Sequence, residues 1–285
     1  MTPKWEQNNI RFECPALEQA VRDSAGYTGS LSGSIYPENV LGITVLMAEK
    51  MEIYSLAGIE HLINLKELVL NDNQVMDISP LKNLIHITNL EINSNYVKNI
   101  YPLSGLKKLR SLTFNENAVK HIFALEYLPD LEKLSFEDNK IEDISPLQTL
   151  PNLNHLNVGL NQINDLSPLS KLTKLESLYL SDNKVSDLSP LANLKKLKTL
   201  ACEYNQISDI TSLANLTRLE EIYLRYNNIS DLSPLMRQIK KGNIHRLKHV
   251  IILKNKLDLN PDSKNMRDIT KLIEYGVEVD YEIQN

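Results

Sequence analysis

A pattern of apolar residues that returns every 22 residues constrains this chain more than any other feature of its sequence. In the unit from Leu175 to Lys196, leucine or valine occupies positions 1, 4, 6, 11, 14, 17 and 20, asparagine position 9 and proline position 16. Position 1 recurs at Ile43, Leu65, Ile87, Leu109, Leu131, Leu153, Leu175, Leu197 and Leu219. A tenth unit begins at Leu247, after six extra residues. A fixed period in this range predicts a solenoid, whose coils contact only their neighbours.

Each unit predicts a short strand followed by a return path. Positions 3 to 7 alternate between outward and inward side chains, as from Ser177 to Ser181, which is typical of a strand. Because every coil runs in the same sense, successive strands are parallel. Proline at position 16 excludes a long helix there, so we expect a turn or a short 3₁₀ segment on the convex side. The predicted class is α/β: a right-handed solenoid with a parallel, concave sheet.

Polar residues recur at two fixed positions of the unit. Position 9 is asparagine at Asn73, Asn95, Asn117, Asn139, Asn161, Asn183, Asn205, Asn227 and Asn255. Since the strand turns into the return path there, each side-chain amide is expected to bond the backbone of adjacent coils in a ladder. Aspartate recurs at position 13, which predicts turn chemistry and not a catalytic acid.

The sequence predicts an N-terminal cap ahead of the array. Residues 1–42 form a tail and a helical cap, with one helix beginning near Pro15 and a short second one over Pro37–Leu41. A cap is expected because the first coil would otherwise expose its apolar side and an unpaired strand edge. Residues 43–260 hold the ten coils, with an insertion at 236–246.

Residues 261–285 are predicted to form a C-terminal cap. A helix over 264–275 begins after Asp262 or Ser263 and carries Met266, Ile269 and Ile273 on one face. A last strand follows over 277–281, where apolar and polar residues alternate.

Composition narrows the classes of partner. The net charge is −5 and the isoelectric point about 5.8, so neither nucleic acid nor a membrane surface is expected as a partner. No apolar run approaches the roughly 18 residues of a membrane span. The N-terminal residues lack the order of a signal peptide, which predicts a cytoplasmic protein; a leader removed ahead of Met1 would instead make it secreted or surface-bound. Cys14 and Cys202 are too few for a disulfide framework. We expect a monomer.

The sequence offers no constellation typical of catalysis. Of the six histidines, His155 and His249 occupy position 3 of strands four coils apart, and neither belongs to a HExxH motif. CxxC, P-loop and GxGxxG patterns are also missing. We therefore expect no enzyme, no cofactor and no metal site.

The outward strand positions indicate a binding patch in the later coils. The candidate residues are Leu160, Tyr179, Tyr204, Tyr223 and Tyr226, with Arg225 and Glu203 at the rim. Tyrosine and arginine are enriched in binding hot spots, and neighbouring strands lie only about 4.8 Å apart. The alternative is that tyrosine simply suits strands. The middle coils instead carry an acidic stretch of Glu91, Glu116, Glu137 and Asp138.

The insertion at 236–246 is basic. It contains Arg237, Lys240, Lys241 and Arg246. Such a segment is usually a solvated loop, and the alternative is a second contact for an acidic partner.

The array resembles the internalin-type bacterial leucine-rich-repeat proteins over about residues 10–260. The shared marks are the 22-residue period, the NxIxDLSPLxxL half of the unit and a helical cap leading into Leu56–Leu62. The resemblance implies a curved solenoid whose concave sheet binds other proteins, and many members of the family are exported and attached to the cell surface.

The sequence is compatible with three functions. The first is a scaffold that binds a protein or peptide on its concave face. The second is a cytosolic regulatory subunit or inhibitor, which would copurify with an enzyme of altered activity. The third is a surface module similar to the adhesive internalins. Catalysis would need a cleft of convergent polar groups.

Overall fold

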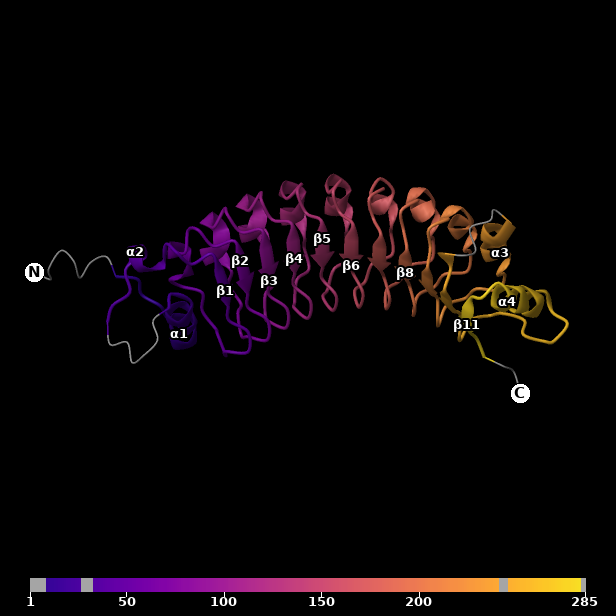
Figure 1. The fold of residues 1–285 in the computed structure, drawn as a ribbon, viewed down its shortest axis with the longest axis horizontal. Helices are drawn as coiled ribbons and strands as arrows, with labels where there is room; N and C mark the ends of the chain where they lie inside the picture. The colour runs from indigo at the N-terminus through magenta and orange to yellow at the C-terminus, as the bar shows by residue number, and fades with distance from the viewer. Residues whose placement is uncertain (1–8, 27–32, 241–245, 283–285) are drawn as a thin grey trace, which may run out of the picture. The chain divides into compact units, whose positions relative to one another are not determined.

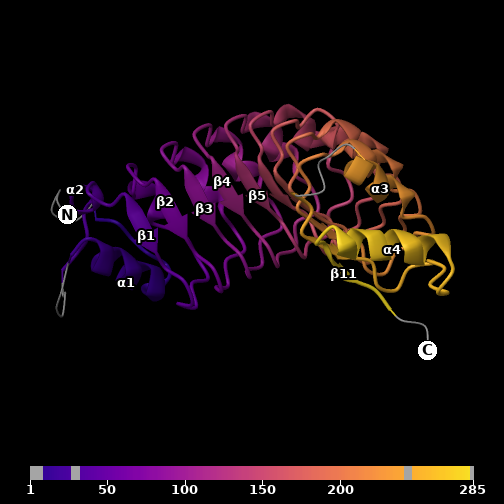
Figure 2. The ribbon, with the colours of Figure 1, turned by 45° about the vertical axis from the view of Figure 1, so that its right-hand side comes forward.

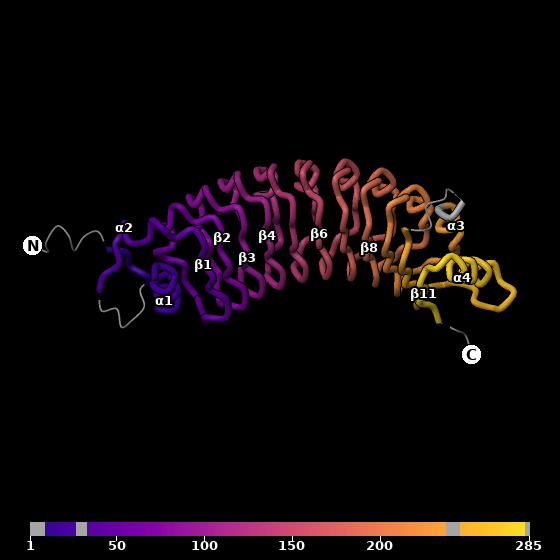
Figure 3. The backbone as a smooth tube through the Cα atoms, viewed as in Figure 1, coloured from indigo at the N-terminus to yellow at the C-terminus, as the bar shows by residue number. Residues whose placement is uncertain are grey.

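The computed structural model describes residues 9–26, 33–240 and 246–282. The chain forms two compact units, Met1–Asn139 and Lys140–Asn285. In both units one coil of chain follows another, each with its strand on one side and a short helical turn on the other (Figures 1 and 3). Within the described residues, no helix has the length and apolar character needed to cross a membrane.

The described part of the first unit begins with two helices and continues with five strands and four 3₁₀ turns. The helices are α1 (Pro15–Ser24) and α2 (Pro37–Val40). The strands are β1 (Val45–Met47), β2 (Glu67–Val69), β3 (Asn89–Glu91), β4 (Ser111–Thr113) and β5 (Lys133–Ser135). The 3₁₀ turns are η1 (Ile59–His61), η2 (Ser79–Asn83), η3 (Tyr101–Gly105) and η4 (Phe123–Tyr127).

The second unit holds six strands and two longer helices. The strands are β6 (His155–Asn157), β7 (Ser177–Tyr179), β8 (Thr199–Ala201), β9 (Glu221–Tyr223), β10 (His249–Ile251) and β11 (Glu278–Asp280). The 3₁₀ turns are η5 (Ser145–Thr149), η6 (Ser167–Leu169), η7 (Ser189–Asn193) and η8 (Thr211–Asn215). The helices are α3 (Ser233–Lys240) and α4 (Lys264–Glu274). Figure 2 shows α4 beside β11 at the C-terminal end.

The strands of each unit are parallel, and each residue pairs with the residue at the same repeat position in the next coil. Leu178 pairs with Leu200 and Leu200 with Ile222, so the inward side chains stack in rows. The strands occupy positions 3 to 5 of the unit, and the prediction of strands over positions 3 to 7 was too long. The reason lies at position 8, where the backbone is left-handed in all ten coils, from Lys50 to Lys254. That conformation turns the chain out of the strand.

Leucine and isoleucine fill the interior of both units. The residues at positions 1, 4 and 6 are buried, and Phe114 stacks on Phe136 with ring centroids 5.6 Å apart. Cys202 is also fully buried, as expected of a small apolar residue in this position.

The predicted asparagine ladder is confirmed. Asn183 accepts a hydrogen bond from the Ile163 backbone N–H at 2.9 Å. Its Nδ2 donates to the carbonyl oxygens of Val158 at 2.9 Å and Leu180 at 3.0 Å. The same bonds recur around Asn73, Asn95 and Asn205. Each amide therefore satisfies backbone groups of two coils at once.

The predicted turn chemistry of aspartate at position 13 is confirmed as well. Asp187 Oδ1 accepts from the Ser189 backbone N–H at 2.7 Å, and Oδ2 accepts from the Ser189 hydroxyl at 2.7 Å. The same turn opens the helical segments after Asp77, Asp143, Asp165 and Asp231.

The C-terminal segment departs from the prediction in two places. The buried face of α4 carries Ile269 and Leu272 with Asn265 and Asp268, whereas Ile273 is 47% exposed. The insertion was expected to be a loop, but its first residues continue helix α3. The helix is compatible with Pro234 because proline is tolerated in the first turn.

Other parts of the C-terminal prediction are confirmed. Ser263 caps α4 by accepting from the Met266 backbone N–H at 3.1 Å. Strand β11 pairs parallel with β10. The division of the chain into an N-terminal cap, an array and a C-terminal cap stays a prediction.

Candidate functional site

A row of outward side chains crosses β7, β8 and β9 in the second unit. The register places Tyr179 beside Ala201 and Ala201 beside Tyr223. Ala201 is only 7% exposed, because the larger side chains on both sides cover it. Both tyrosines are half-buried on the same face of the sheet.

A second row follows the left-handed residues at position 8. It contains Leu160, Asp182, Tyr204 and Tyr226, with φ angles between 51° and 57°. Leu160 is 45% exposed, Tyr204 44% and Tyr226 38%. Elsewhere position 8 holds lysine, aspartate, serine or glutamate. The second unit therefore presents large apolar groups at a backbone position that short polar residues occupy more easily.

The end of this second row is organised around Tyr226. Its ring stacks on Tyr204, with centroids 4.5 Å apart. The guanidinium of Arg225 lies 5.0 Å from the centre of the Tyr226 ring, which is a cation–π distance. Among the described residues, nothing accepts a hydrogen bond from the buried Nε of Arg225.

Burial changes the ionisation of two residues on this face. It raises the pKa of Glu203; Arg225 partly offsets this effect and Asp182 adds to it. Burial also raises the pKa of the Tyr223 hydroxyl, and the neighbouring Glu221 raises it further. Tyr223 therefore remains a neutral hydroxyl at physiological pH.

The structure brings most of the predicted patch together as two neighbouring rows. Tyr179 and Tyr223 lie in the first row, and Tyr204 and Tyr226 in the second. Asp182 separates Leu160 from Tyr204 along the second row. Whether these residues bind a partner stays a prediction.

Two histidines that were not predicted as part of the patch also lie on this face of the sheet. The ring of His155 lies 5.4 Å from that of Tyr179, and the ring of His249 lies 5.7 Å from that of Tyr223. Both occupy position 3, two residues before an outward side chain of their own strand. Because position 3 points outward in every coil, the position of these two histidines could have indicated from the sequence that they lie on this face.

Comparison with known proteins identifies the family. A family model described as leucine-rich repeats, two copies, matches residues 129–171 and 173–215. Internalin C2 from Listeria monocytogenes is 40% identical in an alignment that covers 72% of this chain and 90% of that chain, with a TM-score of 0.70. Internalin InlF from the same organism is 32% identical over 96% of this chain and 91% of that chain, with a TM-score of 0.64. The chain belongs to the internalin family.

A third internalin shares the fold at lower identity. InlJ from Listeria monocytogenes is 20% identical over 95% of this chain and 60% of that chain, with a TM-score of 0.71. A comparison with the curated proteins gave no match.

On the outward face of the first unit of this internalin, asparagines at position 7 form hydrogen bonds with side chains of adjacent coils. Asn93 Nδ2 donates to Asn71 Oδ1 at 2.8 Å and to Thr113 Oγ1 at 2.8 Å. Asn115 continues the network by accepting from the Ser135 hydroxyl at 2.7 Å. These side chains form a second ladder that stabilises the sheet, so their hydrogen-bonding groups are already engaged.

The basic insertion is described only in part. Arg237 is an exposed residue of α3, and Arg246 is exposed just before β10. Lys241 lies outside the described residues, and the same holds for the side chain of Lys240. A role of this segment as a second contact stays a prediction.

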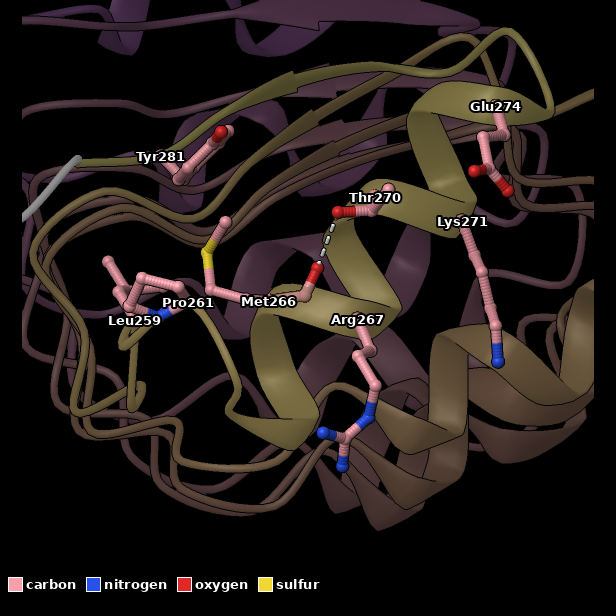
Figure 4. A pocket seen from close by; sticks show the side chains of 8 residues that line it. All are labelled: Leu259, Pro261, Met266, Arg267, Thr270, Lys271, Glu274 and Tyr281. Atoms are coloured by element: carbon pink, nitrogen blue, oxygen red, sulfur yellow. Dashed lines mark hydrogen bonds between the residues drawn. The ribbon is translucent and has the colours of Figure 1, made fainter.

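A cavity lies beside α4, on the C-terminal segment of this internalin (Figure 4). Leu259, Pro261 and Met266 give it an apolar wall, and Tyr281 lies opposite the helix. The Thr270 hydroxyl donates to the Met266 carbonyl oxygen at 2.9 Å, so it is already engaged. Arg267, Lys271 and Glu274 also line the cavity, so charged groups as well as apolar ones surround it.

Proposed function

We propose that this internalin binds a partner protein or peptide on the sheet face of its second unit. The contact residues are Leu160, Tyr179, Tyr204, Tyr223, Tyr226, Arg225 and Glu203, which we call the aromatic patch. Leucine-rich-repeat chains are in general protein-interaction scaffolds, and membership of the family supports that general role.

The observation that carries the proposal is the exposure of bulky residues in left-handed backbone. Leu160, Tyr204 and Tyr226 keep between 38% and 45% of their surface exposed at φ angles of 51° to 54°. A left-handed conformation costs about 1–2 kcal/mol for a residue with a side chain. Aspartate at the same position, as at Asp182, tolerates it better. Bulky exposed groups in such a position favour a role in contact over a role in packing.

The chemistry of the patch suits a protein surface. Tyrosine offers a large apolar ring and a polar hydroxyl, with few rotamers to restrict on binding. The stack of Tyr204 on Tyr226 and the contact with Arg225 hold these groups in place before a partner arrives. Such preorganisation lowers the entropy cost of association. We accordingly propose a binding protein and not an enzyme.

Paired variants test the proposal by copying residues that other coils carry. Tyr204→Asp with Tyr226→Asp introduces the residue found at Asp182, so the backbone is preserved. The matched control is Asp72→Ser, at position 8 of the first unit, which copies Ser94. The full chain and both variants are immobilised and exposed to cell lysate and to culture medium, and the captured proteins are quantified.

We expect the full chain and the control to capture a partner equally well. The double variant should capture at least about tenfold less of it. Equal capture by all three would refute the aromatic patch. A captured enzyme whose activity changes on binding would identify the regulatory function instead. The source of the partner, lysate or medium, would decide between a cytoplasmic and an external location.

A further inference from the structure

Three side chains that commonly bind metals meet where the last two strands pair. His249 lies on β10, and Glu278 and Asp280 lie on β11, with Glu278 directly opposite His249 in the register. His249 Nε2 and Asp280 Oδ2 are 3.1 Å apart. One potential ligand atom from each of the three side chains lies within 4.8 Å of the other two. We propose that His249, Glu278 and Asp280 form a binding site for a divalent transition-metal ion.

The donor set suits such an ion. One imidazole nitrogen and two carboxylate oxygens are ligands that Zn²⁺ accepts at about 2.0–2.2 Å. Ligand atoms of one ion therefore lie about 3 to 4 Å from one another. His249 Nε2 and Asp280 Oδ2 already lie within that range, and a carboxylate oxygen of Glu278 lies within 4.8 Å of a ligand atom of each. Three protein ligands leave a fourth position open for water or another ligand.

The backbone holds the three residues in this arrangement. Glu278 N–H donates to the Lys248 carbonyl oxygen at 2.8 Å, and Ile252 N–H donates to the Asp280 carbonyl oxygen at 2.9 Å. The side chain of His249 is 25% exposed and meets the Tyr223 ring edge-on. These contacts fix the orientation of the imidazole and the spacing of the strands, as a metal site requires.

The charge of the site also favours a cation. A metal ion binds the neutral form of an imidazole and the ionised form of a carboxylate, so a bound divalent ion would balance the charges of the two carboxylates. The two lysines closest in sequence to His249 pair with other carboxylates: Lys248 with Glu220 and Lys254 with Glu282. Neither pairing includes a residue of the proposed site.

Metal binding would connect β11 to the rest of the second unit. Two ligands come from the last strand and one from β10, so the ion links the strands through side chains as well as backbone. A ligand that binds only the folded state raises Tm. The inference stands whether or not the aromatic patch binds a protein.

The test uses the full chain after treatment with a chelator. Zn²⁺ binding is measured by calorimetry, and Co²⁺ binding by visible absorption. The site variants are His249→Gln, Glu278→Gln and Asp280→Asn. The matched control is His155→Gln, because His155 has the same strand position and also contacts a tyrosine. Circular dichroism checks that each variant is folded.

We expect one equivalent of Zn²⁺ to bind the full chain and the control, to raise Tm and to be weakened at least tenfold in each site variant. Co²⁺ should give visible absorption bands in the full chain itself, which tests the site without any substitution. The inference is overturned if the full chain binds no stoichiometric metal. It is also overturned if folded site variants retain full affinity or if His155→Gln loses it.

Discussion

The rings of Tyr204 and Tyr226 stack across adjacent coils, with centroids 4.5 Å apart and planes inclined by 19°. Both residues sit at position 8 with left-handed backbone, so the repeat itself brings their rings together. The stack recovers part of the free energy that this conformation costs. It also holds two exposed rings in one orientation.

A double-mutant cycle measures this coupling. Tyr204→Ala, Tyr226→Ala and the double variant are compared with the full chain in urea unfolding. We expect a favourable coupling energy of about 0.5–1.5 kcal/mol, the range for aromatic pairs. Strictly additive effects would mean that the two rings do not stabilise each other in solution.

Leu160 tests whether the bulky residues at position 8 serve stability. Its side chain is 45% exposed, and asparagine tolerates a left-handed backbone better than leucine. We therefore expect Leu160→Asn to lower the free energy of unfolding by no more than about 0.5 kcal/mol. Leu156→Asn, at a fully buried position of the same coil, is the contrast and should cost more than about 3 kcal/mol. A loss above about 1.5 kcal/mol for Leu160→Asn would indicate a packing role.

The asparagine ladder predicts a large effect from a single amide. Asn183→Ala removes the acceptor of the Ile163 N–H and the donor to Val158 and Leu180. Since these backbone groups are buried, we expect a loss of about 2–3 kcal/mol in chemical unfolding. The control is Asn193→Ala, an exposed residue of η7 in the same coil, which should change stability by less than about 0.5 kcal/mol. Similar losses for both would refute the structural role of the ladder.

Much of the fold could be predicted because the period specifies it many times. The same apolar pattern occurs in ten units, and each unit predicts the same coil of chain. The asparagine at position 9 likewise makes the same kind of hydrogen bonds from coil to coil. Strand length could not be read from the pattern, since position 8 adopts a left-handed backbone without glycine. Its residues, among them Lys50, Glu116 and Tyr226, share no sequence signal for that conformation.

The predicted structure was wrong in the segments that interrupt or follow the 22-residue repeat. Pro234 is compatible with a short 3₁₀ turn or with the first turn of a helix. The chain forms helix α3 here, and this helix continues into the first residues of the insertion. His249 and Asp280 lie 31 residues apart, on either side of segments with no repeat. Only the pairing of β11 with β10 brings them together. The tyrosines of the candidate site were easier to find, because the repeat fixes which positions point outward.

The contact between Asp231 and Lys264 makes stability depend on pH. Lys264 Nζ lies 2.8 Å from Asp231 Oδ1, and this bond together with those from Ser233 lowers the pKa of Asp231 to about 2. The unfolded chain takes up this proton near pH 4, so it binds more protons than the folded chain between pH 4 and 2. The stabilisation is therefore complete above about pH 4 and is lost as the pH falls towards 2.

Asp231→Asn should remove this pH-dependent contribution. Because the Asp231 side chain is 52% exposed, solvent screening limits the effect, and we expect the variant to be about 1 kcal/mol less stable at pH 7. The difference from the full chain should shrink below pH 4 and vanish near pH 2, as measured by urea unfolding at a series of pH values. Asp262→Asn, at an exposed residue just before α4, controls for the loss of a negative charge. A difference that stayed constant from pH 7 to pH 2 would show that the carboxylate of Asp231 contributes no charge-dependent stability.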